Sequence, residues 1–250
     1  MADCIGIGID PYSGKMREEK MSERFVTEPS GESKEFIRQH LPGEELYSSF
    51  MEKMTVLQAF LYETNEKFNL TALGPETFWS KHVADSLSLV KAIPEIASLP
   101  YKLLDLGCGA GFPSLVLAAA FSALQITSVD STGKKIAYVN DAAGKLGLKN
   151  LLGVHARGNE LARKEPYAKA YDIVTARAVS DVETLLKEGS GFLKGEGRGV
   201  LAIYRTSSQL EGEKDFLNRN RKVNWTSTEL FSLPEEAGMR QFLLVRKKGK

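Results

Sequence analysis

The chain has 250 residues, of which 42% are hydrophobic and 26% charged, so it can bury a sizeable core and wholesale disorder is excluded. The net charge of +1 is too small to attract the whole chain to nucleic acid or to a membrane. The charge is unevenly distributed, since residues 1–100 have a net charge of −6 and residues 101–250 a net charge of +7. Two cysteines, Cys4 and Cys108, exclude a disulfide framework, and no apolar run is long enough to span a membrane. We therefore expect a cytoplasmic protein with no membrane contact and no secretion signal.

The first hundred residues predict a loose tail followed by a helical cap. Residues 1–35 are rich in Glu, Lys, Ser, Gly and Pro and show weak periodicity, which is typical of a flexible tail. Between 44 and 68 apolar residues recur at helical spacing, and a second helical stretch is predicted at 75–91. We place the helical cap at 36–98.

After Pro100 short apolar runs alternate with helical stretches, which predicts βαβ units and a mostly parallel sheet over 99–250. The predicted strands are 102–106, 125–129, 151–155, 171–175, 200–204, 224–231 and 241–245. The predicted helices are 113–120, 133–146, 182–193 and 207–218. The loop before the last strand is too short for a helical crossover, so the last two strands are predicted to pair antiparallel at one edge.

Three glycines follow the first predicted strand. Gly107, Gly109 and Gly111 precede a helix, where glycine permits a tight turn and free amides favour polar or negative groups. A dinucleotide fingerprint needs glycine at 112, where Phe112 stands. With Asp105, the spacing instead resembles the first motif of class I S-adenosylmethionine (SAM) methyltransferases, in which this acid lies close to the methionine part of the cofactor.

Asp130 ends the second predicted strand, 23 residues after Gly107. A carboxylate at this place can accept hydrogen bonds from both ribose hydroxyls of an adenosine. A structural turn alone can produce the glycine pattern. The loop, the terminal Asp and the alternating elements together favour a nucleoside-type cofactor.

The sequence says less about the methyl acceptor than about the cofactor. Exocyclic amine methyltransferases usually carry Asn/Asp-Pro-Pro-aromatic after the fourth strand, where residues 175–179 here read Thr-Ala-Arg-Ala-Val. Neither cysteine follows proline, so the Pro-Cys nucleophile of cytosine C5 methylation is absent from the sequence. Guanine N7 exposes a lone pair and needs neither base nor nucleophile. The sequence is compatible with that acceptor without selecting it.

Five motifs in order resemble the RsmG (GidB) family, and the resemblance covers about residues 45–248. They are Asn-Leu-Thr-Ala at 69–72, Lys-His-Val-Ala-Asp-Ser-Leu at 81–87, the glycine segment at 103–113, Val-Asp-Ser-Thr-Gly-Lys-Lys at 129–135 and residues 175–179. The resemblance implies an α/β fold, the Rossmann-like class I SAM-dependent methyltransferase with a seven-stranded, mostly parallel sheet and an N-terminal helical cap. It also implies methylation of N7 of a guanine in small-subunit (16S) ribosomal RNA near the decoding site, with SAM as methyl donor and S-adenosylhomocysteine as product.

Further expectations follow for partners and site residues. The implied partner is small-subunit rRNA or the assembled small ribosomal subunit, and by default the protein is a monomer. The expected cofactor-binding residues are Asp105, Gly107, Gly109, Gly111, Phe112, Asp130, Ser131, Thr132, Gly158, Asn159 and Arg177. The expected RNA-binding residues are Lys134, Lys135, Arg163, Lys164 and Arg205. No metal site is expected, since His40 and His155 lack partners at metal-ligand spacing.

Arg177 and His82 are the expected catalytic residues. Arg177 at a strand end is by default a surface cation, but in a site its guanidinium could hold a phosphate or guanine O6 and leave N7 free. His82 is not needed as a base for N7 attack, so we expect a structural or RNA-orienting role. It could contact Asp85, which lies three residues further along the same helical face.

Several residues depart from the family pattern. Asn159 stands where relatives commonly carry Glu, Tyr204 and Arg205 stand where relatives show a Lys, and Ser114 replaces a Gly. These departures concern the fit of the substrate more than SAM binding. Two alternatives stay open: a class I methyltransferase for a non-RNA acceptor, and a non-catalytic assembly factor that binds SAM or rRNA.

Overall fold

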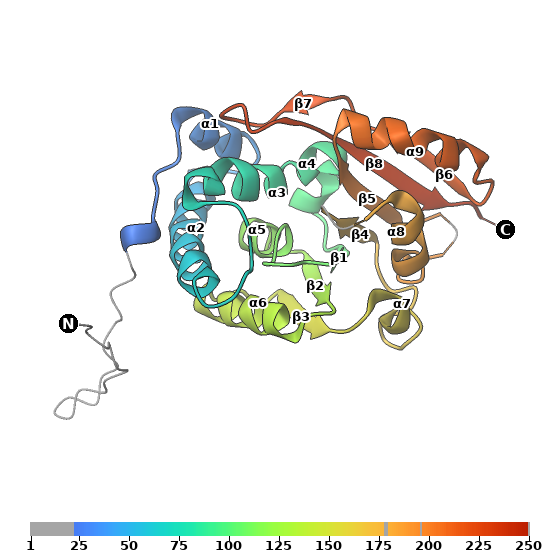
Figure 1. Cartoon of the computed structure of the whole chain (residues 1–250), viewed down its shortest axis with the longest axis horizontal. Helices are drawn as coiled ribbons and strands as arrows, with labels where there is room; N and C mark the ends of the chain where they lie inside the picture. Colours follow the sequence, from blue (N-terminus) through green and yellow to red (C-terminus); the bar gives the residue numbers. More distant parts are fainter. Residues whose placement is uncertain (1–22, 178–179, 196, 250) are drawn as a thin grey trace.

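A central sheet lies between two layers of helices (Figure 1). The computed structural model describes residues 23–177, 180–195 and 197–249. Within these residues seven strands run in the order β3-β2-β1-β4-β5-β8-β6, and a two-residue strand, β7, pairs with the start of β8. The strands are β1 (Lys102–Leu106), β2 (Gln125–Asp130), β3 (Leu151–His155), β4 (Ile173–Ala176), β5 (Val200–Arg205), β6 (Val223–Ser227), β7 (Phe231–Ser232) and β8 (Met239–Lys247).

Strands β1 to β5 pair in parallel, and β8 runs antiparallel to both of its neighbours, β5 and β6. The predicted antiparallel pairing at one edge is confirmed. The strand order reverses between β1 and β4, so a crevice forms outside the carboxyl ends of these two strands. The fold therefore places the ends of β1, β2, β4 and β5 around one opening.

The predicted strand at 224–231 is divided into β6 and β7. Ser227 pairs with Leu243, and Phe231 pairs with Arg240. The chain thus advances four residues from β6 to β7 while β8 advances only three. This mismatch is a bulge, which bends the chain and separates the two short strands.

Helices cover both faces of the sheet. They are α1 (Gly31–Gln39), α2 (Glu44–Asn65), α3 (Asp85–Leu87), α4 (Leu89–Ala92), α5 (Ser114–Ala120), α6 (Gly133–Lys145), α7 (Gly158–Leu161), α8 (Val182–Gly189) and α9 (Ser207–Arg219). Short 3-10 turns lie at Glu23–Phe25, Pro75–Thr77 and Pro94–Ala97, and a π-helical segment at Phe78–Ala84 leads into α3. The stretch predicted at 75–91 is thus a chain of short helical pieces. None of the helices in the described ranges is long and apolar enough to cross a membrane.

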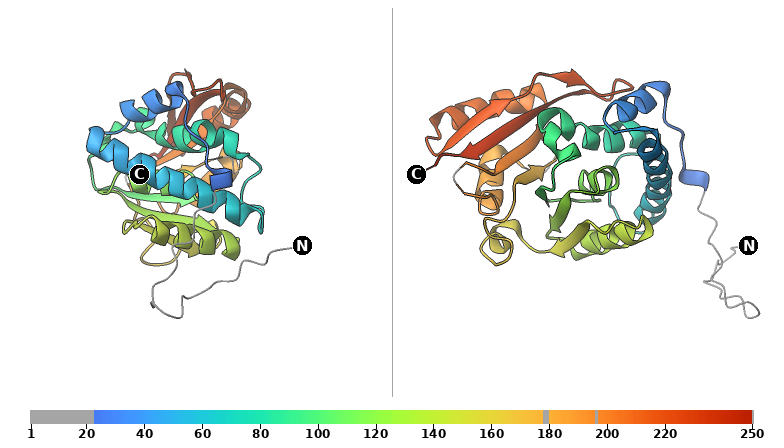
Figure 2. Two further views of the ribbon diagram at one scale, coloured as in Figure 1. Left: turned by 90° about the vertical axis from the view of Figure 1, so that its left-hand side faces the viewer. Right: turned by 180° about the vertical axis from the view of Figure 1, so that it is seen from behind.

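Two cores fill the space between sheet and helices. Leu103 on β1 packs into the core that the cap shares with α5 and α6, while its neighbour Leu104 packs into the core beneath α8 and α9. This alternation follows from the opposite directions of successive side chains on a strand. Figure 2 shows α2 running alongside α5 and α6, with which it is in contact. The cap therefore packs as part of the main core.

The segment before the cap is more ordered than the sequence predicts. Residues 1–22 of the expected tail lie outside the described residues. The Thr27 amide donates to Gln58 Oε1 at 3.0 Å, and Trp79 Nε1 donates to the Thr27 carbonyl at 2.6 Å. The prediction of a loose tail is therefore wrong for residues 23–35, because main-chain hydrogen bonds and α1 fix them to the cap.

Candidate active site

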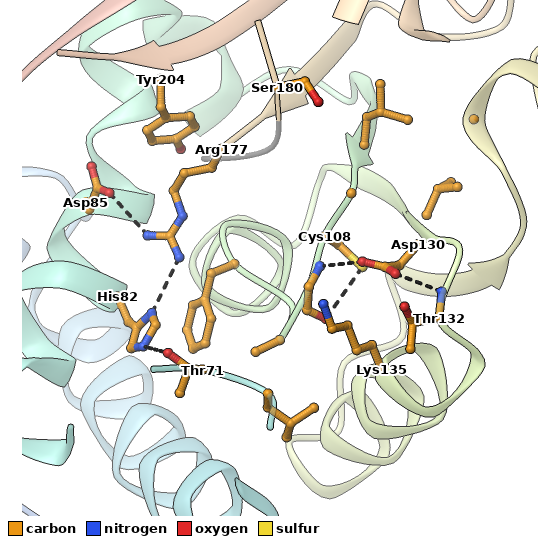
Figure 3. A pocket seen from close by; sticks show the side chains of 18 of the residues that line it. Thr71, His82, Asp85, Cys108, Asp130, Thr132, Lys135, Arg177, Ser180 and Tyr204 are labelled. Carbon is orange, nitrogen blue, oxygen red and sulfur yellow. Dashed lines mark hydrogen bonds and ion pairs between the residues drawn. The ribbon is translucent and has the colours of Figure 1, made fainter. Parts of the chain in front are cut away.

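An open cavity of about 1120 Å³ lies at the carboxyl edge of the sheet, between the strand ends and the cap. The glycine loop and the residues after β2 and β3 form one half of its wall. Residues from the cap and from the ends of β4, β5 and β7 form the other half. Figure 3 shows these two halves facing each other, with Asp130 on one and Asp85 on the other.

The glycine loop needs its glycines. Gly107, Gly109 and Gly111 have φ angles of +70°, +55° and +82°, a region that other residues rarely adopt. A Cβ at position 111 would also lie 2.4 Å from Leu115 Cδ1. The loop can therefore bring its backbone against a ligand and still pack closely on α5.

Asp130 fixes this loop to the end of β2. Its Oδ2 accepts from the Gly109 amide at 3.1 Å and its Oδ1 accepts from the Thr132 amide at 2.8 Å. The carboxylate, Ser131 and Thr132 all line the cavity. Each carboxylate oxygen has a second lone pair, so the group can accept further hydrogen bonds from a ligand.

Gly158 and Asn159 line the same half at the start of α7. A Cβ at Gly158 would lie 2.6 Å from Leu106 Cδ1, so glycine allows α7 to approach β1. The structure thus brings the predicted cofactor residues after β1, β2 and β3 together on one wall.

Asp105 and Gly111 are not on that wall. Asp105 is 1% exposed and does not line the cavity; its Oδ2 accepts from the Ser114 amide at 3.3 Å. Burial raises the pKa of this carboxyl to about 6. Asp105 therefore supports the start of α5 beneath the loop, and its expected contact with the cofactor stays a prediction. Gly111 likewise shapes the turn without lining the cavity.

Phe112 joins the glycine loop to the cap. Its ring stacks on the His82 ring with centroids 4.2 Å apart, and the Arg177 guanidinium lies 5.6 Å from its centroid. All three residues line the cavity, and Figure 3 shows His82 and Arg177 on the same side of it. The predicted site residues at 82, 112 and 177 are thus brought together from three separate motifs.

His82 is a buried, neutral imidazole. Burial, assisted by the nearby Arg177 charge, lowers its pKa to about 3. Arg177 Nη2 lies 3.4 Å from His82 Nδ1, and Thr71 Oγ1 lies 3.3 Å from Nε2. Because a guanidinium only donates, we assign Nδ1 as the acceptor and Nε2 as the protonated nitrogen that faces Thr71. The expected His82–Asp85 contact is replaced by contacts of both residues with Arg177.

Asp85 joins two arginines. Arg177 Nη1 donates to its Oδ2 at 3.2 Å, while Arg240 donates to Oδ1 at 2.7 Å and to Oδ2 at 2.9 Å. The Asp85 side chain is 4% exposed, so its charge needs these partners. Two guanidinium groups face one carboxylate, which leaves this half of the cavity with an excess positive charge. Arg240 was not predicted, since it lies 155 residues from Asp85 and outside the quoted motifs.

The predicted RNA-binding cations differ in their positions. Lys135 lines the cavity, and Lys134 is exposed beside it with its ammonium 5.1 Å from the Phe68 ring centroid. Arg163 and Lys164 are exposed in the segment after α7, away from the cavity wall.

The prediction that Arg205 binds RNA is wrong. It is 2% exposed, and its guanidinium makes a two-point ion pair with Glu213, at 2.8 and 2.9 Å. A buried, fully paired guanidinium cannot bind an RNA phosphate. Tyr204 lines the cavity as a neutral phenol whose hydroxyl donates to the Ser86 carbonyl at 3.0 Å, and burial raises its pKa further. Arg177 and Arg240, and not Arg205, therefore supply positive charge to this half.

The described residues hold no group of three or more His, Cys, Asp or Glu placed to bind a metal ion. His40 and His155 instead contact main-chain carbonyls, those of Phe36 and Ser131.

The fold and the site define a class. The structure is similar to an SAM-dependent O-methyltransferase from Thermotoga maritima, with a TM-score of 0.51 and 16% sequence identity over 76% of this chain and 72% of that chain. This likeness and the strand order show the class I SAM-dependent methyltransferase fold.

The family follows from sequence. The family model described as rRNA small subunit methyltransferase G (GidB) matches residues 50–240, and this chain belongs to that family. Relatives named ribosomal RNA small subunit methyltransferase G include one from Geobacillus thermodenitrificans, 37% identical over 75% of this chain and 78% of the relative. Another, from Staphylococcus aureus, is 35% identical over 82% of this chain and 84% of the relative.

Proposed function

We propose that this protein methylates N7 of a guanine in small-subunit rRNA, with SAM as the methyl donor. The observation that carries the proposal is the division of one cavity into a nucleoside-type half around Asp130 and a positively charged half around Arg177 and Arg240. The family supports the substrate class. Such a substrate places the reaction in the cytoplasm.

The residues present fit SAM. Asp130 is held by two backbone amides and keeps lone pairs for the ribose hydroxyls, while the glycine loop lets the backbone approach the methionine part. Phe112 and Asn159 complete this wall. When bound, SAM supplies an electrophilic methyl group on a positively charged sulfur.

The second half fits an acceptor that needs no base. Guanine N7 attacks with its own lone pair and no proton leaves it, so the chemistry requires position and exclusion of water. His82 is neutral at physiological pH, but its Nδ1 faces the Arg177 guanidinium and is not free to act as a base. Arg177 and Arg240 favour the anionic RNA backbone or guanine O6, both of which accept hydrogen bonds. We therefore assign Arg177 and His82 to orienting the acceptor.

The test uses methyl-labelled SAM with small ribosomal subunits from a strain that lacks this modification, followed by digestion and nucleoside analysis. Label in 7-methylguanosine supports the proposal. Label in another nucleoside, or only in a non-RNA acceptor, overturns the assigned acceptor. Measurable SAM binding without transfer to subunits or naked rRNA would favour the assembly-factor alternative.

Salt dependence provides a second test of the RNA surface. Lys134, Lys135, Arg163 and Lys164 are proposed phosphate contacts, so the affinity for rRNA should fall steeply as salt rises. An affinity that does not change between low and physiological salt would contradict this surface.

A further inference from the structure

A buried ion pair between β5 and α9 lies beside the proposed acceptor half. Arg205 Nε and Nη2 donate to the two carboxylate oxygens of Glu213 at 2.8 and 2.9 Å, and the two side chains are 2% and 13% exposed. Burial of two charges costs free energy that their mutual attraction recovers only with good geometry and further hydrogen bonds. Arg205 and Glu213 each make such a further hydrogen bond, and both bonds go to the main chain at the start of α8.

Both members of the pair hold the segment 180–182, which leads into α8. Arg205 Nη2 donates to the Ser180 carbonyl at 2.8 Å, and Glu213 Oε1 accepts from the Val182 amide at 2.8 Å. Between them Asp181 caps α8 by accepting from the Thr184 amide at 2.8 Å. The path of the main chain at 180–182 is therefore fixed by side chains from two other elements.

This segment forms part of the cavity wall. Ser180 lines the cavity near Arg177 and Tyr204 (Figure 3). Thr206, which follows Arg205 directly, and Gln209, three residues further on, line it as well and hydrogen-bond to each other in the cap of α9. The cavity wall next to Arg205 is thus lined by two residues with hydroxyl side chains and one with an amide side chain.

The position of this wall indicates that it contacts the methyl acceptor and not the cofactor. It lies at the ends of β4 and β5, whereas the glycine loop, Asp130 and Asn159 lie at the ends of β1, β2 and β3 on the other side of the switch point. Hydroxyl and amide groups both donate and accept hydrogen bonds, which suits the base edge and the ribose of a nucleotide.

We propose that Arg205 and Glu213 are a positioning pair, which holds a polar wall formed by Ser180, Thr206 and Gln209 against the RNA nucleotide that accepts the methyl group. Neither member of the pair touches the substrate. The inference rests on the proposed function, because it names the part of the same cavity that receives the acceptor.

Steady-state kinetics of Glu213→Gln and Arg205→Lys on small ribosomal subunits test the pair, with SAM affinity measured by calorimetry and melting temperature recorded for each variant. We expect KM for the subunit to rise about tenfold, which corresponds to the loss of about one hydrogen bond to a charged group. The Kd for SAM should change less than twofold. Glu211→Gln is the matched control, since its ion pair with Lys214 lies exposed on the same helix; it should change neither constant.

A double variant separates positioning from stability. Arg205→Met with Glu213→Leu replaces the pair by apolar groups, which often restores stability but removes the hydrogen bonds to Ser180 and Val182. We expect a wild-type melting temperature together with a KM that is still raised. Ser180→Ala, which removes one wall hydroxyl without touching the pair, should raise KM in the same direction.

Three results would overturn the inference. The KM for the subunit could be unchanged in both single variants, or the double variant could recover the wild-type KM together with the wild-type stability. The third is a single variant that loses SAM affinity while its KM for the subunit is unchanged. Amide exchange keeps the two proposals apart if the wild-type protein methylates no RNA. The Val182 amide should then still exchange faster in Glu213→Gln than in wild type, and an unchanged rate would refute the pair itself.

Discussion

The Phe112 ring lies flat on the His82 ring, with centroids 4.2 Å apart and an angle of 21° between the planes. One residue belongs to the glycine loop and the other to the π-helical segment of the cap. The stack makes the cap a wall of the cavity and excludes water from the imidazole. The cap therefore contributes side chains to the wall of the cavity as well as to the core.

The first prediction concerns pH and His82. Its pKa in the folded protein is lowered to about 3 by burial, whereas in the unfolded chain the group titrates near 6.5. Between these values the unfolded state binds more protons, so stability falls as the pH falls. In urea unfolding at pH 7, 6 and 5, wild type should lose up to about 1.4 kcal/mol per pH unit relative to His82→Gln.

The pKa of Asp105 is raised to about 6, so below pH 6 this group makes stability rise as the pH falls. Asp105 is present in both wild type and His82→Gln, so its effect cancels when the two proteins are compared. Parallel pH profiles for wild type and His82→Gln would refute a neutral His82.

The second prediction concerns the two arginines that share one carboxylate. Asp85→Asn should lower the free energy of unfolding by about 3 kcal/mol, because two largely buried guanidinium groups lose their charged partner. Glu183→Gln, in an exposed ion pair with Lys187, should leave the free energy of unfolding nearly unchanged. Denaturant unfolding of both variants measures this difference, and equal costs would contradict the buried network.

The third prediction distinguishes two glycines of one loop. Both have positive φ, but a Cβ at 109 meets nothing within 4 Å, whereas at 111 it would lie 2.4 Å from Leu115 Cδ1. Gly109→Ala should therefore cost about 1 kcal/mol from backbone strain alone. Gly111→Ala should cost about 3 kcal/mol because overpacking adds to it. Thermal and urea unfolding measure both costs, and an equal cost at the two positions would contradict the prediction.

The fourth prediction concerns the cofactor. Asp130→Asn keeps the side-chain volume but removes the negative charge, so SAM affinity should fall about 10- to 100-fold, the loss of a charge-assisted hydrogen bond. Asp141→Asn, on the exposed face of α6, should bind SAM like wild type. Calorimetry measures both, and unchanged affinity in Asp130→Asn would remove Asp130 from the cofactor site.

Local features of the sequence predicted much of the fold. The apolar runs at 102–106 and 151–155 coincide with β1 and β3, because strand length and flanking turns are encoded within a few residues. The helix α1 was missed, since only Ser33 and Ile37 of its nine residues are buried and the apolar periodicity is weak. Ser30, which caps it by accepting from the Ser33 amide, was the available signal.

The site was predicted where its residues lie in continuous motifs. The glycine loop, Asp130 and Asn159 follow successive strands, and parallel topology brings such positions together. Pairings between distant elements are not encoded locally, so Arg240 was missed as the partner of Asp85. The interpretation of Arg205 as a surface cation failed for another reason: its partner Glu213 lies in the next helix, and the burial of the pair between β5 and α9 depends on how that helix packs.

β8 enters the sheet between β5 and β6, and its second residue, Arg240, reaches Asp85 in the cavity. Translation delivers a chain from its N-terminus, so β8 and the second arginine of the site are made after every other described strand. A nascent chain that stops before β8 has β6 without its neighbour in the sheet and Asp85 without its closer partner. We therefore expect the positively charged half of the cavity to be completed only when β8 has been made.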